Sequence, residues 1–221
     1  MHVPFGREMF CGVDEAGRGS VMGPLVVGAV YVEDESELVE LGVRDSKKLT
    51  PKRREAMFDK ILDIADGYSL VTVSAEEIDL RRERETLNEI ELAMFVDATS
   101  RYPALRVYAD CPDVNEMSFQ SALTARLGGV DVIARHKADD TYPVVSAASI
   151  IAKVTRDRII ADISAEFGES IGSGYPSDTV TTGFIEKWIK ENGCSPKYTR
   201  NSWETVKSIK SRLSVRKITD W

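Results

Sequence analysis

Acidic residues recur at the ends of short apolar runs in this 221-residue chain. Asp14 and Glu15 come directly after one such run and Asp110 closes a second. Asp139 follows a third run by a few residues. Strand ends meet at one edge of an open α/β sheet, where ligand sites gather. A single acid in such a place is more often a turn or capping residue, but the repetition predicts a shared carboxylate site.

Clustered carboxylates suit the hydrolysis of a phosphodiester, which is anionic and reacts slowly with water. Two hard cations can activate water, neutralise charge in the transition state and stabilise the departing oxygen. A ligand set made only of oxygens favours Mg²⁺ or Mn²⁺ over zinc. We therefore expect a site for two such ions, about 3.5–4 Å apart.

The composition gives little support to other chemistries. The chain has two histidines and three widely spaced cysteines, Cys11, Cys111 and Cys194, so neither a zinc site nor a disulfide framework is expected. Because His2 lies at the N-terminus, His136 is the remaining candidate for imidazole chemistry, and we interpret it as structural. A Ser/His/Asp mechanism is not expected.

The apolar runs predict the elements that must position these acids. Strands are expected over 9–13, 25–32, 68–73, 105–109 and 130–134, and helices over 51–65, 74–102 and most of the chain after 144. Thr50 is placed to cap the helix that Pro51 begins. This order predicts an α/β fold, with helices against a mixed, partly parallel central sheet. We expect a catalytic domain over 1–168 and a helical C-terminal extension over 169–221.

Five blocks of the sequence, in order over nearly the whole chain, resemble the ribonuclease HII family and its archaeal branch in particular. They are DEAGRG at 14–19, DSKKL at 45–49, KAD at 137–139, YPVVSAASIIAKVTRD at 142–157 and GSGYPSD at 172–178. The resemblance implies a ribonuclease H-like fold and an endonuclease that hydrolyses the RNA strand of RNA/DNA hybrids. It also implies four metal-binding catalytic carboxylates, which match Asp14, Glu15, Asp110 and Asp139.

The fourth carboxylate has a competitor, because KADD offers both Asp139 and Asp140. The position directly after KA favours Asp139, while Asp140 keeps a minor claim. Asp139 is expected to be the more peripheral ligand, held by a loop before a helix.

The resemblance also implies groups that read the substrate. Gly17, Arg18 and Gly19 form a loop that reads a ribose 2′-hydroxyl, although GRG alone would be an ordinary turn. Tyr175, between a glycine and a proline, is expected to stack on the downstream sugar. The expected reaction is incision on the 5′ side of a single ribonucleotide in duplex DNA, giving 5′-phosphate and 3′-hydroxyl ends.

Other polar residues are candidates for phosphate contacts. Ser146, Ser149, Lys153 and Arg156 follow one another at steps of three, four and three, which puts them on one stripe of a helix. The stripe faces either phosphates or solvent. Ser46 and Lys47, just before the helix at 51, are either phosphate ligands or capping and surface residues.

Charge is unevenly distributed along the chain. The formal net charge is −7, yet residues 197–217 hold seven Lys/Arg against one Glu. This basic tail is expected either to clamp a duplex backbone or to pack Trp203, Val206 and Ile209 against the core, and both can hold on opposite faces.

No apolar run suggests a signal peptide or a membrane span, so a cytoplasmic protein without membrane association is expected. We expect a monomer, and a replication-clamp partner stays open. The alternatives are a two-metal nuclease that cuts DNA, a nucleic-acid-binding module without catalysis, and an acidic interaction domain.

Overall fold

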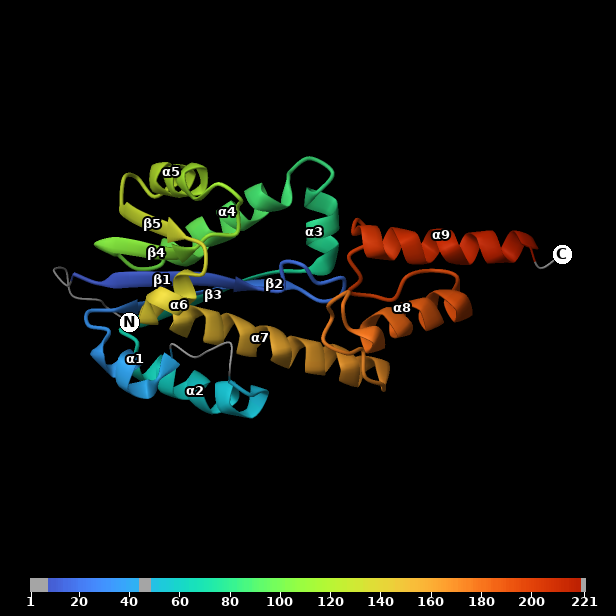
Figure 1. The fold of residues 1–221 in the computed structure, drawn as a ribbon, viewed down its shortest axis with the longest axis horizontal. Coiled ribbons are helices and arrows are strands. Elements are labelled where there is room, and N and C mark those ends of the chain that lie inside the picture. Colours follow the sequence, from blue (N-terminus) through green and yellow to red (C-terminus); the bar gives the residue numbers. More distant parts are fainter. Residues whose placement is uncertain (1–7, 44–48, 220–221) are drawn as a thin grey trace. The chain divides into compact units, whose positions relative to one another are not determined.

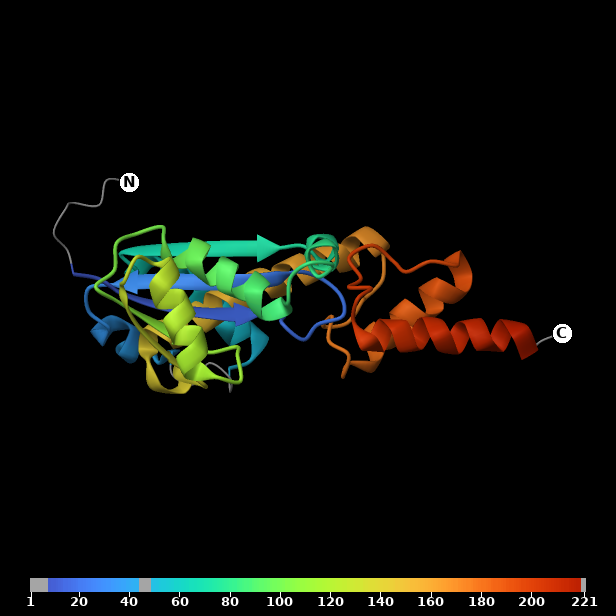
Figure 2. The ribbon, with the colours of Figure 1, turned by 90° about the horizontal axis from the view of Figure 1, so that it is seen from above.

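Five strands form one mixed sheet, in the order β3-β2-β1-β4-β5, within the computed structural model, which describes residues 8–43 and 49–219 (Figures 1 and 2). The strands are β1 (Phe10–Ala16), β2 (Leu25–Val32), β3 (Gly67–Val73), β4 (Arg106–Asp110) and β5 (Asp131–Arg135). β1 runs antiparallel to β2 and parallel to β4, and β5 runs parallel to β4. The predicted mixed sheet is therefore confirmed, with each strand within a few residues of its expected position.

The helices are α1 (Ser36–Leu41), α2 (Pro51–Ile64), α3 (Ala75–Arg81), α4 (Leu87–Thr99), α5 (Glu116–Arg126), α6 (Ala138–Thr141), α7 (Pro143–Phe167), α8 (Thr179–Asn192) and α9 (Glu204–Thr219). Thr50 caps α2 as predicted, since its hydroxyl accepts a hydrogen bond from the Arg53 amide. The prediction of one helix over 74–102 was wrong. This segment is divided into α3 and α4 because the sequence RERET at 82–86 offers no apolar side chain to hold a further helical turn against a core.

The described residues divide into two units that do not follow the expected boundary at 168. The first unit takes the described parts of 1–16, 26–72 and 88–154, and the second takes 17–25, 73–87 and 155–221. The boundary between the two units falls inside α7, between residues 154 and 155, where the helix itself is continuous. Beyond it, Ile160 and Ile163 belong to a separate apolar cluster with Val21 and Met22, so packing rather than chain order sets the boundary.

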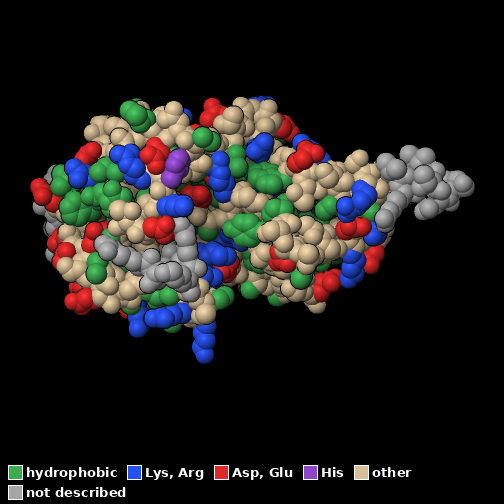
Figure 3. Space-filling model, viewed as in Figure 1, with side chains coloured by type: hydrophobic (Ala, Val, Ile, Leu, Met, Phe, Trp, Pro, Cys, Tyr) green, Lys and Arg blue, Asp and Glu red, His purple; other side chains and the backbone are tan. Residues whose placement is uncertain are grey.

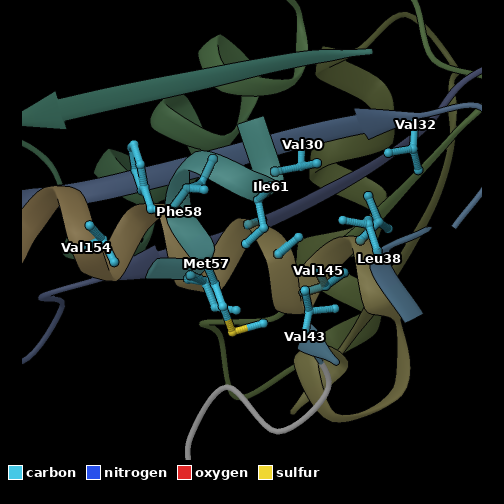
Figure 4. Close-up of a cluster of buried hydrophobic side chains, with 14 of the residues drawn as sticks. Val30, Val32, Leu38, Val43, Met57, Phe58, Ile61, Val145 and Val154 are labelled. Carbon is cyan, nitrogen blue, oxygen red and sulfur yellow. The ribbon is translucent and has the colours of Figure 1, made fainter. Parts of the chain in front are cut away.

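The core of the first unit lies between the sheet and α1, α2 and the first half of α7 (Figures 1 and 4). Val30 and Val32 of β2 pack there with Leu38 of α1 and Ile61 of α2 (Figure 4). β2 is buried at every residue, as expected of a strand covered on both faces. α4 and α5 cover the opposite face of the sheet (Figure 1).

Two glycines let α7 lie unusually close to the sheet. A Cβ at Gly12 of β1 would lie 2.3 Å from the Val144 carbonyl carbon, and one at Gly28 of β2 would lie 2.8 Å from the Ala148 carbonyl oxygen. Such distances are far inside van der Waals contact. Neither backbone segment can rotate away as a side chain could, so both positions require glycine.

The second unit has its own core, formed by the second half of α7, α8, α9 and Val21 and Met22. Val206 and Ile209 are buried in it and Trp203 packs against it. The predicted packing of the basic tail on a core is therefore confirmed for these three residues.

We expect Gly12→Ala to lower the free energy of unfolding by roughly 3 kcal/mol or more, because overpacking a filled core usually costs about 1–3 kcal/mol and the clashing atoms here are backbone. Urea denaturation followed by circular dichroism measures this. Gly183→Ala is the matched control: it lies inside α8, and a Cβ there would have no neighbour within 4 Å, so it should raise stability by about 0.5–1 kcal/mol. Equal effects of the two substitutions would contradict the close-packing argument.

Candidate active site

The register of two parallel strands brings Asp14 and Asp110 to adjacent strand ends. Val13 of β1 is paired with Ala109 of β4, and the next residue of each strand is the acid. Side chains alternate along a strand, so both acids point to the face opposite Val13 and Ala109. Gly12, two residues before Asp14 on the same face, lies against the start of α7. The acids therefore belong to the α7 side of the sheet.

Asp14 is the most deeply placed member of this pair, with a relative exposure of 5%. Its Oδ1 accepts a hydrogen bond of 2.7 Å from the Glu15 amide, and the Ser149 hydroxyl donates to the same carboxyl group. Burial raises the pKa of Asp14 well above its usual range, and the charges of Glu15 and Asp110 raise it further. The two hydrogen bonds offset only part of this, so the cluster disfavours its own ionisation.

Ser149 reaches Asp14 because of the glycines that admit α7. In the antiparallel register Asp14 faces Gly28, and Gly28 lies against the Ala148 carbonyl, one residue before Ser149. A side chain at position 28 would push this turn of α7 away from the sheet. The predicted substrate ligand Ser149 thus contacts a carboxylate in the structure.

Asp110 is tied to the segment that carries Asp139. Its Oδ1 accepts a 2.8 Å hydrogen bond from the Ala138 amide, at the start of the four-residue helix α6. Lys137 precedes that helix in the left-handed conformation, with φ 57° and ψ 38°, which is uncommon for a residue other than glycine. Asp139 is buried, with 1% relative exposure, whereas Asp140 is exposed, a difference that favours Asp139 as the inward-facing acid.

The donor chemistry of this cluster fits hard divalent cations. The acids offer only carboxylate oxygens, and their mutual repulsion is what a bound cation would relieve. Over residues 8–43 and 49–219, no three acidic, histidine or cysteine side chains are close enough, as they stand, to hold one ion. Glu15 and Asp110 lie near enough to raise the pKa of Asp14, and one or two carboxylates suffice for Mg²⁺, which keeps several water ligands.

The loop Gly17, Arg18 and Gly19 belongs to the second unit, where two buried arginines fix its course. Arg200 donates to the Arg18 carbonyl at 3.0 Å and to the Gly23 carbonyl at 3.1 Å. Arg156 donates to the carbonyls of Met22 and Pro24 at 3.2 and 3.3 Å. Burial and the nearby Arg156 charge lower the pKa of Arg200 to about 9, so it remains charged at neutral pH.

The interpretation of Arg156 as part of a phosphate-facing stripe was therefore wrong, and the same holds for Ser146. Arg156 has no exposed surface, and the Ser146 hydroxyl donates to the Val43 carbonyl within the core. Helical spacing placed these residues on one face correctly, but Ser146 and Arg156 of that face are buried. Lys153, half-buried, keeps its prediction as a phosphate ligand. Ser46 and Lys47 lie outside the described residues.

The glycines of the loop differ in what they permit. Gly17 has φ +95°, and a Cβ there would lie 2.3 Å from Arg156 Nε. Gly19 has no such φ, is exposed, and would have nothing within 4 Å of an added Cβ. The fold therefore requires glycine at 17 but not at 19.

Tyr175, the predicted stacking residue, also lies in the second unit. The Arg156 guanidinium sits over its ring, 4.7 Å from the centroid. Gly174, just before it, has φ +83°, and its carbonyl accepts hydrogen bonds from the Val21 and Met22 amides. These contacts tie the GSGYPSD block to residues 17–25 and hold the ring in a defined position.

His136 and the tail residue Arg200 have structural partners. The His136 amide donates to Glu116 Oε1 at 2.6 Å, and its Nε2 lies 2.7 Å from the Asp113 carbonyl oxygen. Arg200 is one of the seven cations of the basic tail but is fully buried, so the prediction of duplex contact is wrong for this residue. Nothing in the sequence pattern signals this role, since a buried arginine and a surface arginine look alike until the fold is known.

Acidic side chains lie at the ends of two adjacent strands in a mixed sheet with the order β3-β2-β1-β4-β5. This arrangement defines a ribonuclease H-like nuclease. The chain belongs to the ribonuclease HII family, because the family model for ribonuclease HII matches residues 11–206. It is 47% identical to ribonuclease HII of Thermococcus kodakarensis over 211 residues, which are 93% of this chain and 91% of the relative. It is 41% identical over 225 residues to ribonuclease HII of Methanococcus maripaludis, covering 98% and 93% of the two chains.

Solved structures agree with this membership. The ribonuclease H2 of Pyrococcus horikoshii has a TM-score of 0.87 at 44% identity, with 93% of this chain and 99% of that chain covered. A PCNA:RNase HII complex from Archaeoglobus fulgidus has a TM-score of 0.85 at 42% identity, covering 90% and 96%. A ribonuclease HIII, at 20% identity and a TM-score of 0.74 over 96% of this chain and 71% of that one, supports the fold alone.

The chain is therefore an enzyme, a ribonuclease H with endonuclease activity, and its family depends on divalent metal ions. No helix among the described residues is long and apolar enough to cross a membrane. On the face seen in Figure 3, basic and acidic side chains are interspersed, so no patch of one sign dominates that face.

We expect Asp14→Asn to raise the melting temperature of the metal-free protein at neutral pH. The raised pKa means that folding disfavours the charged carboxylate, so its destabilising effect is complete above the folded-state pKa and fades as pH falls toward the ordinary aspartate range. A gain of about 1 kcal/mol corresponds to roughly 2–4 °C in a chain of this size. Thermal melts across pH measure the difference.

Asp140→Asn is the control, because it removes the same charge from an exposed neighbour and should leave the melting temperature nearly unchanged. Added Mg²⁺ or Mn²⁺ should stabilise the wild type more than Asp14→Asn. A wild type that is more stable than Asp14→Asn at every pH without metal would contradict the repulsive cluster.

Proposed function

We propose that this enzyme cuts duplex DNA on the 5′ side of a single embedded ribonucleotide, as well as the RNA strand of RNA/DNA hybrids. The products carry 5′-phosphate and 3′-hydroxyl ends. Asp14, Glu15, Asp110 and Asp139 hold two divalent ions, Mg²⁺ or Mn²⁺. The observation that carries the metal site is the strand register that brings Asp14 and Asp110 to adjacent strand ends, with Asp14 buried at 5% exposure. Burial and the charges of Glu15 and Asp110 raise the pKa of Asp14, a repulsion that a bound cation would relieve.

Asp14 and Asp110 are each held in place by other residues of the first unit. Asp14 is fixed by the Ser149 hydroxyl and the Glu15 amide, so its position changes little on loading. Asp110 is oriented by the Ala138 amide, which couples it to the segment that ends in Asp139. Bound ions would supply an activated water and neutralise charge on the phosphate and the departing 3′ oxygen. The protein itself would hold the mutually repelling carboxylates in position to bind these ions.

Recognition of the ribose is assigned to the loop of Gly17, Arg18 and Gly19, which begins two residues after Glu15 in the chain. The fold does not need glycine at 19, so we attribute the missing side chain to the substrate: a bare backbone lets a sugar approach closely. Arg200 holds the Arg18 carbonyl at 3.0 Å, which fixes the loop before substrate arrives. Such preorganisation saves the entropy of ordering it during binding.

Selection of a ribose followed by a deoxyribose is assigned to Tyr175. Its ring is supported from one side by the Arg156 guanidinium, and the positive φ of Gly174 fixes the chain just before it. A supported aromatic face suits stacking on the downstream sugar. An added 2′-hydroxyl there would crowd the ring, so the deoxyribose is preferred. Lys153 is proposed as a backbone phosphate ligand.

A replication clamp is the proposed protein partner. The support is the Archaeoglobus fulgidus relative, whose solved structure is a PCNA:RNase HII complex. Co-elution of the whole chain with a sliding clamp in gel filtration tests this, and separate elution at concentrations well above micromolar would contradict it.

Asp110→Asn should lower turnover in Mg²⁺ by more than about a hundredfold, since losing groups that merely orient metal ligands already costs roughly 10- to 100-fold. The fold should persist, because the amide retains an oxygen to accept from Ala138. Single-turnover cleavage of a hybrid, with circular dichroism alongside, measures both. Asp140→Asn again serves as the matched variant and should keep most of the turnover, whereas near wild-type turnover of Asp110→Asn would remove Asp110 from the catalytic group.

The ribonucleotide preference is tested with duplexes that carry four consecutive ribonucleotides, one or none, and with the cut mapped to a single nucleotide. Wild type should cut 5′ of the single ribonucleotide and leave all-DNA intact. Tyr175→Ala should lose more activity at the single site than in the run. A wild type that cuts only the run would refute the junction mechanism, and one that cuts all-DNA would indicate a DNA nuclease.

Gly19→Ala gives a sharper test of the loop. Stability should change little, because a methyl group at 19 meets no protein atom, whereas cleavage at the single ribonucleotide should fall by about tenfold or more, a loss of ~1.4 kcal/mol in transition-state binding. Gly17→Ala is the contrasting variant and should destabilise the fold. Full activity of Gly19→Ala would show that its bare backbone does not approach the substrate.

A further inference from the structure

An open pocket of about 430 Å³ lies wholly within the second unit. Its lining includes Arg18, Gly19, Arg82, Trp203 and Lys207. Segments far apart in sequence meet here: the loop after β1, the segment between α3 and α4, and the start of α9. We call it the Trp203 pocket.

Three cations line this pocket, Arg18, Arg82 and Lys207, against one acid, Glu204. This excess stands out in a chain whose formal net charge is −7. In the part of the chain that the structure describes, neither Arg82 nor Lys207 forms an ion pair with a carboxylate. Their charge is therefore available to a ligand.

Other basic residues of the second unit form ion pairs with carboxylates. Arg81 lies 2.7 Å from Glu85, Lys190 lies 2.8 Å from Glu186, and Arg212 pairs with the same glutamate at 2.5 Å. The contrast separates ordinary surface ion pairs from the two cations of the pocket. Among the described residues, Arg82 and Lys207 line the pocket without a carboxylate partner, and such a site is suited to binding an anion.

Trp203 gives the pocket a fixed wall. The Arg82 guanidinium lies over its ring at 5.1 Å from the centroid, and that of Arg200 at 5.0 Å. Arg200 is buried and bonded to the Arg18 carbonyl. A guanidinium stacked on an indole keeps its in-plane N–H donors for other partners, in the fork geometry that matches phosphate.

We propose that the Trp203 pocket binds a backbone phosphate of the nucleic-acid duplex, next to the nucleotide read by the loop at 17–19. The proposal rests on the proposed function, because Arg18 and Gly19 belong to both the loop and the pocket lining. A duplex whose ribose lies on that loop brings a neighbouring phosphodiester to Arg82 and Lys207. The pocket adds affinity without reading sequence, since phosphates carry no base information.

The test measures equilibrium binding of the whole chain to a duplex with one ribonucleotide, in the absence of divalent metal, over a salt titration. Arg82→Ala/Lys207→Ala should weaken binding about tenfold at low salt and reduce the slope of log K against log salt by about 0.9, which is the contribution of one phosphate contact. Lys190→Ala removes one positive charge from the same unit at a residue already paired with Glu186 and should leave the slope unchanged. Arg82→Lys should keep the slope yet bind less tightly.

Thermal melts establish that each variant is folded. An unchanged slope in the double variant overturns the proposal, as does an equal loss in Lys190→Ala. If inorganic phosphate stabilises the wild type but not the double variant while duplex binding is equal in both, the pocket takes a small anion and the backbone assignment is wrong. Cleavage by wild type is scored separately: failure to cut at the ribonucleotide rejects the proposed function, while the salt slope still decides whether the pocket holds a duplex phosphate.

Discussion

Electrostatic repulsion among carboxylates gathered at one edge of the sheet is the constraint on which the first unit depends. The pairing of Val13 with Ala109 forces Asp14 and Asp110 together, and burial strengthens their repulsion by excluding water. Asp14 is held by Ser149, and Ser149 can be there only because Gly28 lets α7 approach the sheet. The close packing of α7 on the sheet therefore holds Asp14 in the cluster, although burial and repulsion disfavour its charged form.

The second unit faces the opposite electrostatic problem, because its buried charges are cations. Arg156 and Arg200 give up hydration, and Arg200 feels the charge of Arg156 as well. Backbone carbonyls of residues 17–25 and 173 compensate by accepting their hydrogen bonds. Lysine could not replace either, because only the planar fork reaches several carbonyls at once. A loop whose carbonyls accept these hydrogen bonds is held in one conformation.

Much of the fold, and the position of Asp14 and Asp110 at adjacent strand ends, could be predicted from sequence, because strand periodicity and strand-end position are local properties. Asp14 and Asp110 were found in this way, and the packing of Val206 and Ile209 followed from helical spacing. Arg156 was misinterpreted because spacing shows which residues share a helix face but not whether that face meets solvent or another segment. The division into two units could not be predicted for the same reason: Val21 and Ile163 share a core through contacts far apart in the chain.

The two loop glycines show how one motif can combine different physical demands. A side chain at position 17 is excluded by the positive φ of Gly17 and by Arg156, so the fold of this chain requires glycine there whatever the protein binds. Gly19 meets no such demand, and its missing side chain is unexplained by the fold. A motif match gives both residues the same weight. The structure separates them, and the residue that the fold does not require is the one whose identity points to a ligand.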